Sequence, residues 1–116
     1  MNTEKRIGKI TAAIFGVGGY QDAAFGLSLT FESKRGAWGV GTFINGGWCP
    51  GRIDPDKHCQ WTEEDRGRQQ IEMCRKIAET LNAAAVDDVA KLVGKPVEVT
   101  FEAICLKDWR ILTEAI

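Results

Sequence analysis

Glycine is distributed so unevenly along this chain that it constrains the fold more than any other feature. Of the 13 glycines, 11 lie between Gly8 and Gly51. Because glycine weakens helices and marks turns, bulges and close backbone approaches, the first half of the chain is predicted to be rich in strands. The length of 116 residues suits one domain with a core of its own, which we place at residues 1–116.

Alternation of apolar and polar side chains predicts the strands of this first half. In Phe25–Glu32, apolar residues alternate with small or polar ones, which is typical of a half-buried strand. The same period over about Lys5–Phe15 places Ile10, Ala12 and Ile14 on one face of an earlier strand. Each strand is therefore expected to turn one apolar face toward a core.

A third strand, Ala37–Ile44, is predicted to follow a hairpin loop at Ser33–Gly36. Its alternation places Gly39 and Gly41 on one face, beside Gly26 of the preceding strand. Glycine inside a strand marks the close approach of a backbone, a bulge or a ligand. These glycines therefore predict a bare patch on one face of the sheet.

A long helix is predicted to open the second half of the chain. Thr62 is a suitable N-cap, and Asp65 three residues later gives a variant of the capping box. We expect the helix to run to about Ala84, with an apolar stripe at helical spacing. The stripe consists of Ile71, Cys74, Ala78 and Leu81, and Ile77 widens it.

A second, short helix is expected next, and Gly94 followed by Pro96 ends it. Alternation over Val97–Glu102 and about Trp109–Thr113 predicts two last strands, paired as a hairpin. The predicted fold is a single α+β domain. It has an antiparallel sheet of about five strands, in the order β-β-β-α-α-β-β, with one long and one short helix packed on one face.

The charge balance limits the classes of function. Fifteen basic and sixteen acidic residues give a formal net charge of −1, whereas a general nucleic-acid binder carries a basic excess. No apolar run approaches the roughly 20 residues that span a bilayer, and the first residues lack the apolar stretch of a signal peptide. We therefore expect a cytosolic protein that binds neither nucleic acid in general nor membranes.

Four cysteines and one histidine raise the question of metal or thiol chemistry. In a cytosolic chain the thiols are expected to be free, and we expect Cys74 and Cys105 to be small buried residues. Cys49, His58 and Cys59 lie close together in sequence, but their spacing is not that of a structural zinc site. A Cys–His nucleophilic pair would also lack an orienting third group. We predict no metal, no cofactor and no catalytic residue.

Loops and glycine-rich strands of the first half form the candidate binding surface. The 16-residue connection Asn45–Gln60 is long for a compact domain, and such connections are often functional. Gly16–Gly19 has the wrong spacing for a nucleotide-binding fingerprint. Rings and guanidinium groups around bare backbone nevertheless suit base stacking, phosphate binding or protein binding. The candidate residues are Gly18, Gly19, Tyr20, Asp22, Arg35, Trp38, Gly39, Gly41, Trp48 and Arg52.

Several segments, taken together, resemble a known family. They are Gly18–Ala23 with Phe25–Leu27, Trp61–Glu63, Gly94–Phe101 and Trp109–Glu114. The resemblance covers most of the chain and is to a family of small, functionally uncharacterised proteins encoded by bacteriophages and prophages. It implies a viral accessory protein that acts in the cytoplasm of the host bacterium, and it implies no particular catalytic or binding residue.

The main hypothesis is a non-enzymatic binding protein that modulates the host or counters its defences. In one version an oligomer sequesters a small anionic, nucleotide-like ligand with backbone N–H groups, Arg35 or Arg52, and aromatic rings. In the other version the same surface blocks a host protein, with Trp48 as the anchor. Two alternatives stay open: a minor structural or assembly protein of the phage particle, and a small Cys/His-dependent hydrolase.

Overall fold

The computed structural model describes residues 3–18, 24–49 and 62–116. In chain order, the elements of this part are β1 (Thr3–Gly18), β2 (Ala24–Glu32), β3 (Gly39–Trp48), α2 (Glu63–Ala84), the 3-10 helix η2 (Val89–Leu92), β4 (Pro96–Glu102), β5 (Cys105–Ile111) and the 3-10 helix η3 (Thr113–Ala115). All neighbouring strands are antiparallel, and they form one five-stranded sheet. The predicted α+β class with a five-stranded antiparallel sheet is confirmed.

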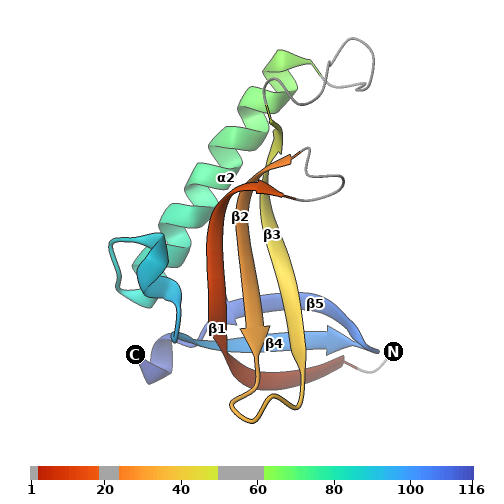
Figure 1. Cartoon of the computed structure of the whole chain (residues 1–116), viewed down its shortest axis with the longest axis vertical. Helices are drawn as coiled ribbons and strands as arrows, with labels where there is room; N and C mark the ends of the chain where they lie inside the picture. The colour runs from red at the N-terminus through yellow and green to blue at the C-terminus, as the bar shows by residue number, and fades with distance from the viewer. Residues whose placement is uncertain (1–2, 19–23, 50–61) are drawn as a thin grey trace.

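The sheet curls because β1 is long enough to belong to both of its halves. Residues Thr3–Lys9 pair with β4, whereas Lys9–Gly18 pair with β2. Beyond these neighbours, β3 and β5 form the two margins, so that the order is β3-β2-β1-β4-β5. Figure 1 shows how β1 bends from the half that contains β4 and β5 into the half that contains β2 and β3.

The hydrophobic core joins both halves of the curled sheet. Fully buried side chains of β2 and β4 meet there, and Leu92 of η2 is buried with them. Two ring contacts cross the core: the ring centroids of Phe31 and Trp109 are 5.0 Å apart, and those of Trp38 and Phe101 are 5.4 Å apart. Since burial of one such side chain contributes about 1.5–3 kcal/mol, this shared core holds the two halves in a fixed relation.

Helix α2 begins and ends where the sequence predicts. The Thr62 hydroxyl accepts a hydrogen bond from the Asp65 N–H at 3.2 Å, and the Asp65 carboxylate accepts one from the Thr62 N–H at 2.9 Å. These bonds stabilise the charged carboxylate, and they lower the pKa of Asp65. At the other end, Ala85 takes a left-handed conformation with φ of 58° and closes the helix after Ala84.

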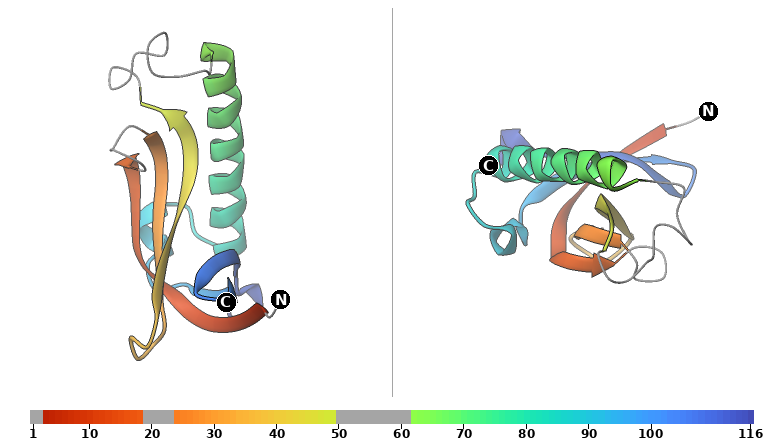
Figure 2. Two further views of the ribbon diagram at one scale, coloured as in Figure 1. Left: turned by 90° about the vertical axis from the view of Figure 1, so that its right-hand side faces the viewer. Right: turned by 90° about the horizontal axis from the view of Figure 1, so that it is seen from above.

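The predicted apolar stripe of α2 is wrong for three of its five residues. Ile71, Cys74 and Ala78 are exposed, whereas Ile77 and Leu81 pack against the core. The buried residues of the helix are Met73, Thr80 and Ala84. The reason is that the helix lies along the β3 side of the sheet, as both views of Figure 2 show, and only a narrow face of it is covered.

Two further details of the predicted architecture are wrong. The strand order in the sheet differs, because β1 takes the centre and its first half pairs with β4. The described residues contain one long helix, and the expected second helix is the four-residue 3-10 turn η2. Asp88 caps this turn by accepting a hydrogen bond from the Ala90 N–H at 2.7 Å, and the left-handed Gly94 follows shortly after it.

A β-bulge overturns the predicted faces of β1. The pairing with β2 shifts between Ile10 and Ala12, which leaves Thr11 as an extra residue. As a result Ile10 is fully buried, whereas Ile14, predicted to share its face, is 64% exposed. The strand also continues through Gly18, so the glycine cluster that was expected to form a turn begins inside β1.

Candidate functional site

The surface is hollowed beside the hairpin that joins β2 to β3. The hollow is shallow, and its volume is about 420 Å³. Its lining residues are Arg6, Ile7, Ser33, Lys34, Arg35, Ala37 and Trp38. Arg6 and Ile7 come from the first half of β1, which the bend of that strand brings next to the hairpin. Because three lining residues are cationic, we call this feature the basic hollow.

The hairpin that carries two of these cations is held by Ser33. The Ser33 hydroxyl accepts hydrogen bonds from the N–H groups of Ala37, at 2.7 Å, and Trp38, at 3.4 Å. The Ser33 N–H donates to the Trp38 carbonyl at 3.2 Å, and its carbonyl accepts from the Gly36 N–H at 3.1 Å. Gly36 turns the chain with φ of 70°, a value that glycine adopts readily. The backbone of Lys34 and Arg35 is thus part of an ordered turn.

Trp38 forms the apolar wall of the basic hollow. Its ring packs edge-on against Phe101, and it also lies close to the backbone of Gly8. A Cβ atom added at Gly8 would lie 2.7 Å from the Trp38 ring, so a side chain at that position would displace the ring. The Trp38 indole is therefore held between Phe101 of the core and the backbone of Gly8.

The charges of the basic hollow are only partly neutralised. Arg6 forms an ion pair with Glu4 at 2.8 Å, and both side chains are largely exposed. Lys34 and Arg35 are exposed, and within the described part of the chain neither has an ion-pair partner. Two neighbouring cations without counter-charge attract anions, and this attraction is strongest at low ionic strength.

The structure brings together only some of the predicted site residues. Arg35 and Trp38 meet at the basic hollow, and Gly39 is the next residue along the chain. Gly18 lies at the opposite end of the sheet, opposite Ala24 in the pairing of β1 with β2. Since a strand rises about 3.3 Å per residue, the two ends of β3 are about 30 Å apart. Gly19, Tyr20, Asp22 and Arg52 lie outside the described residues.

Trp48 is not the exposed anchor that one version of the hypothesis requires. It is the last residue of β3, and only 3% of its surface is exposed. The Arg66 guanidinium of α2 lies 5.7 Å from the centre of its ring, which is cation–π distance. The segment that was predicted to begin a long loop at Asn45 therefore continues β3 and packs beneath the helix.

The predicted bare patch is present at two of its three glycines. Gly39 and Gly41 are exposed and lie opposite Glu32 and Thr30 of β2. Gly26, by contrast, is buried, and a Cβ atom added there would collide with the Ile44 carbonyl. Glycine is required at position 26 because the backbones of β2 and β3 approach each other closely there, and this residue provides no accessible surface.

Sequence reasoning missed five residues of the basic hollow: Arg6, Ile7, Ser33, Lys34 and Ala37. The hairpin loop itself was recognised, and its adjacent basic residues are a signal that could have placed Lys34 in the site. Arg6 and Ile7 had no such signal, because their position depends on the pairing of β1 with two different strands.

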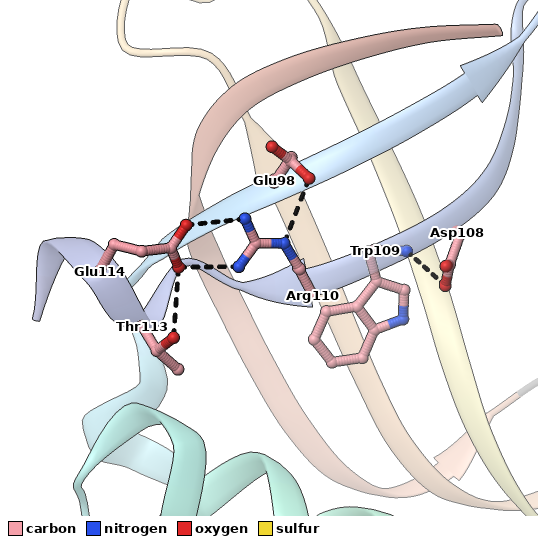
Figure 3. A network of polar contacts seen from close by, with 6 residues as sticks. All are labelled: Glu98, Asp108, Trp109, Arg110, Thr113 and Glu114. Carbon is pink, nitrogen blue, oxygen red and sulfur yellow. Dashed lines mark hydrogen bonds and ion pairs between the residues drawn. The ribbon is translucent and has the colours of Figure 1, made fainter.

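A second polar cluster, shown in Figure 3, is saturated with ion pairs. Arg110 of β5 donates to both carboxylate oxygens of Glu114, at 2.8 Å each, and to Glu98 of β4 at 3.2 Å. The bonds from Arg110 lower the pKa of Glu114 to about 2, and the two carboxylates raise the pKa of Arg110. Because the single cation Arg110 is bound by two carboxylates, this cluster fastens η3 to the sheet and offers no unpaired cation to an anionic ligand.

The thiols show no clustering within the described residues. Cys74 and Cys105 are exposed, so the expectation that they are buried is wrong, and Cys49 is half-buried. In the described segments, no group of three or more His, Cys, Asp or Glu side chains is arranged to hold a metal ion. His58 and Cys59 lie outside those segments, so the alternative of a Cys/His-dependent hydrolase is left untested.

Comparison with known proteins found no matching family model, no matching curated protein and no matching solved structure. Among the described residues, no helix is long and apolar enough to cross a membrane. What the protein does is therefore inferred from the chemistry of its own surface, above all from the basic hollow.

Proposed function

We propose that this chain is a non-enzymatic binding protein that captures a small anionic, nucleotide-like ligand at the basic hollow. The observation that supports this most strongly is the pair Lys34 and Arg35, two exposed cations without a described counter-charge on an ordered hairpin. Ordering of the hairpin lowers the conformational entropy that a ligand would otherwise have to restrict.

The composition of the basic hollow suits a phosphate joined to a flat ring. The Arg35 guanidinium can donate two parallel hydrogen bonds to one phosphate, and Lys34 adds a second, more mobile charge. Trp38 offers an apolar surface next to both cations. The hollow is local and open, which suits a small ligand. The net charge of the whole chain is only −1, which does not favour binding of a long nucleic-acid backbone.

The resemblance to bacteriophage and prophage proteins suggests the setting of this binding. In the cytoplasm of a host bacterium, capture of a nucleotide-like signal would modulate the host or counter its defences. The version in which the protein blocks a host protein through Trp48 loses its anchor, because Trp48 is buried.

Titration calorimetry with inorganic pyrophosphate and adenosine monophosphate tests this proposal. At low ionic strength both probes should bind, and binding should weaken as salt is added. In the double variant Lys34→Gln/Arg35→Gln the affinity should fall at least about tenfold, since charge-assisted hydrogen bonds contribute about 1.5–3 kcal/mol each. The charge-matched control is Arg75→Gln/Lys91→Gln, because both of these cations are exposed outside the basic hollow. Equal affinity in the two double variants, or no binding of either probe by the unaltered protein, would refute the proposal.

A further inference from the structure

The second half of β1 has one edge that no described strand covers. On one side it pairs with β2 as far as Gly18, whereas on the other side β4 starts at Pro96, opposite Lys9. Ile10 makes the last backbone hydrogen bonds on that second side, to the segment just before β4. From Ala12 onward, no described residue bonds to this edge. Figure 2 shows β1 as the outermost strand of this half, with α2 on the far side beyond β3.

Beyond the bulge at Thr11, this free edge lacks the charged residues and prolines that usually protect an edge strand. The segment Ala12–Gly18 contains no charged residue and no proline. Three of its large apolar side chains are exposed: Ile14 by 64%, Phe15 by 52% and Val17 by 37%. Along such an edge every second residue directs an N–H and a C=O outward, and an uncharged apolar edge of this kind is a template for a further strand.

The other margins of the sheet are protected. The outer strand β5 contains Lys107, Asp108 and Arg110, and the first half of β1 contains Glu4, Lys5 and Arg6. Helix α2 contacts β3, and although Gly39 and Gly41 are exposed, none of the large apolar side chains of this strand is. Charged side chains and covering helices are the means by which natural sheets prevent edge-to-edge pairing. Among the described strands, the Ala12–Gly18 edge is therefore the one that combines an uncharged sequence with exposed large apolar side chains.

We propose that the Ala12–Gly18 edge pairs with the same edge of a second copy of this chain, antiparallel and about a two-fold axis. The three-stranded halves of the two molecules would then form a continuous six-stranded sheet, with β1 beside β1 of the partner. Because a two-fold interface uses the same surface on both molecules, the edge must be complementary to itself.

The segment meets this requirement when the axis passes through Phe15. Antiparallel pairing then sets Ile14 opposite Gly16 and Val17 opposite Ala13, so that a large side chain faces a small one in both pairs. A Cβ atom added at Gly16 would have no heavy atom within 4 Å, which leaves space for the Ile14 side chain of the other molecule. The two Phe15 rings meet at the axis.

The aromatic residues beside the axis extend this contact. Within one molecule, the ring centroids of Phe15 and Phe25 are 5.0 Å apart. Pairing about Phe15 would therefore align four phenylalanine rings on one face of the joined sheet. An uncharged strand also meets itself without like-charge repulsion, whereas a charged partner strand would find no complementary charge here.

This inference goes beyond the proposed function and does not depend on it. The basic hollow uses the first half of β1 and the β2–β3 hairpin, whereas the pairing edge is the second half of β1. A dimer joined at Ala12–Gly18 would leave both basic hollows open, since they lie toward the opposite ends of the two strands.

Sedimentation equilibrium of the purified full chain tests the pairing. The unaltered protein should have the mass of two 12.8 kDa chains at micromolar concentration. Phe15→Lys removes the ring pair at the axis and places two like charges opposite each other there, and the two effects together should raise the dissociation constant about tenfold. Phe15→Glu should behave in the same way by itself, but an equimolar mixture of the two variants should restore a dimer, because the charges are then opposite.

Two controls separate lost pairing from lost folding. The first control is Ile71→Lys, which places a lysine on α2, away from the pairing edge. Ile71 is 59% exposed, and this variant should leave the dimer intact. Ile14→Lys acts on the other face of the same edge and should weaken the dimer if Phe15→Lys fails to fold, as judged by circular dichroism. A monomeric unaltered protein at about 100 µM, an undiminished dimer in the folded edge variants, or a mixture that stays monomeric would overturn the inference. Pyrophosphate binding by such a monomer would leave the proposed function in place.

Discussion

Gly46 of β3 lies so close to helix α2 that even a methyl group should not fit there. A Cβ atom at this position would be 2.7 Å from the Met73 sulfur, 3.0 Å from the Met73 methyl carbon and 2.8 Å from the Phe25 carbonyl oxygen. Met73 is buried, and the carbonyl belongs to the neighbouring strand, so neither can move freely. Overpacking of this kind costs about 1–3 kcal/mol, and we expect Gly46→Ala to destabilise the fold by that amount.

The same substitution in the helix provides the matched control. Gly67 lies in α2, and an added Cβ atom would have no heavy atom within 4 Å. Alanine is favoured over glycine inside a helix by about 0.8–1 kcal/mol, so Gly67→Ala should stabilise the protein. The two Gly→Ala variants should therefore differ by about 2–4 kcal/mol in the free energy of unfolding.

Urea denaturation followed by circular dichroism measures this difference, and each 1 kcal/mol should also shift the melting temperature by about 4 °C. In a Met73→Ala background the added cost of Gly46→Ala should shrink by at least about 0.5 kcal/mol, because the sulfur contact is gone. If Gly46→Ala and Gly67→Ala change stability in the same direction, or if the Met73→Ala background makes no difference, α2 does not pack on β3 as described.

Four further substitutions examine the helix cap, two thiols and the ion pair between Arg110 and Glu114. Thr62→Ala removes the side-chain acceptor of the α2 cap and should cost about 1 kcal/mol in a denaturant titration. Cys74 and Cys105 should react with a thiol reagent in the native protein, and serine at either position should change stability by less than about 0.5 kcal/mol; slow reaction until unfolding would contradict their exposure. Glu114, whose pKa is lowered from 4.5 to about 2 by Arg110, should contribute stability above pH 4.5 and lose this contribution as the pH falls through about 2. In melting curves recorded at a series of pH values, Glu114→Gln should make the loss of stability at acid pH smaller. The effect should be small, because the ion pair is exposed. An unchanged loss of stability would show that the ion pair contributes nothing.

The sequence was most informative where the signal was local. The alternation of Phe25–Glu32, the turn at Ser33–Gly36 and the Thr62 cap each depend on a few neighbouring residues, and the structure contains all three. The same locality explains the α+β class, since strand and helix periods follow from backbone geometry alone.

Errors arose where one element depends on another that is distant in sequence. Thr11 gives no sign of the bulge that sends Ile14 to the exposed face, because the bulge is defined only by pairing with β2. The helix face was misjudged for a similar reason: Cys74 would be buried only if a second layer covered its side of α2. The sequence predicts a loop at Trp48, whereas in the structure β3 continues through this residue and Arg66 of α2 lies over its ring.

By itself, the sequence determined the kinds of elements, the helix cap and the turn that presents Lys34 and Arg35. It also determined that glycines would concentrate on β-structure, because their backbone freedom and missing side chains are properties of single residues. Only the tertiary structure decided what each glycine does. Gly46 allows α2 to approach β3, whereas Gly39 and Gly41 leave part of the sheet bare. The physical reason is that packing and strand pairing depend on residues far apart in the chain. The pairing of β1 with both β2 and β4 places Arg6 beside the hairpin, and it leaves one edge of the second half of β1 without a described strand.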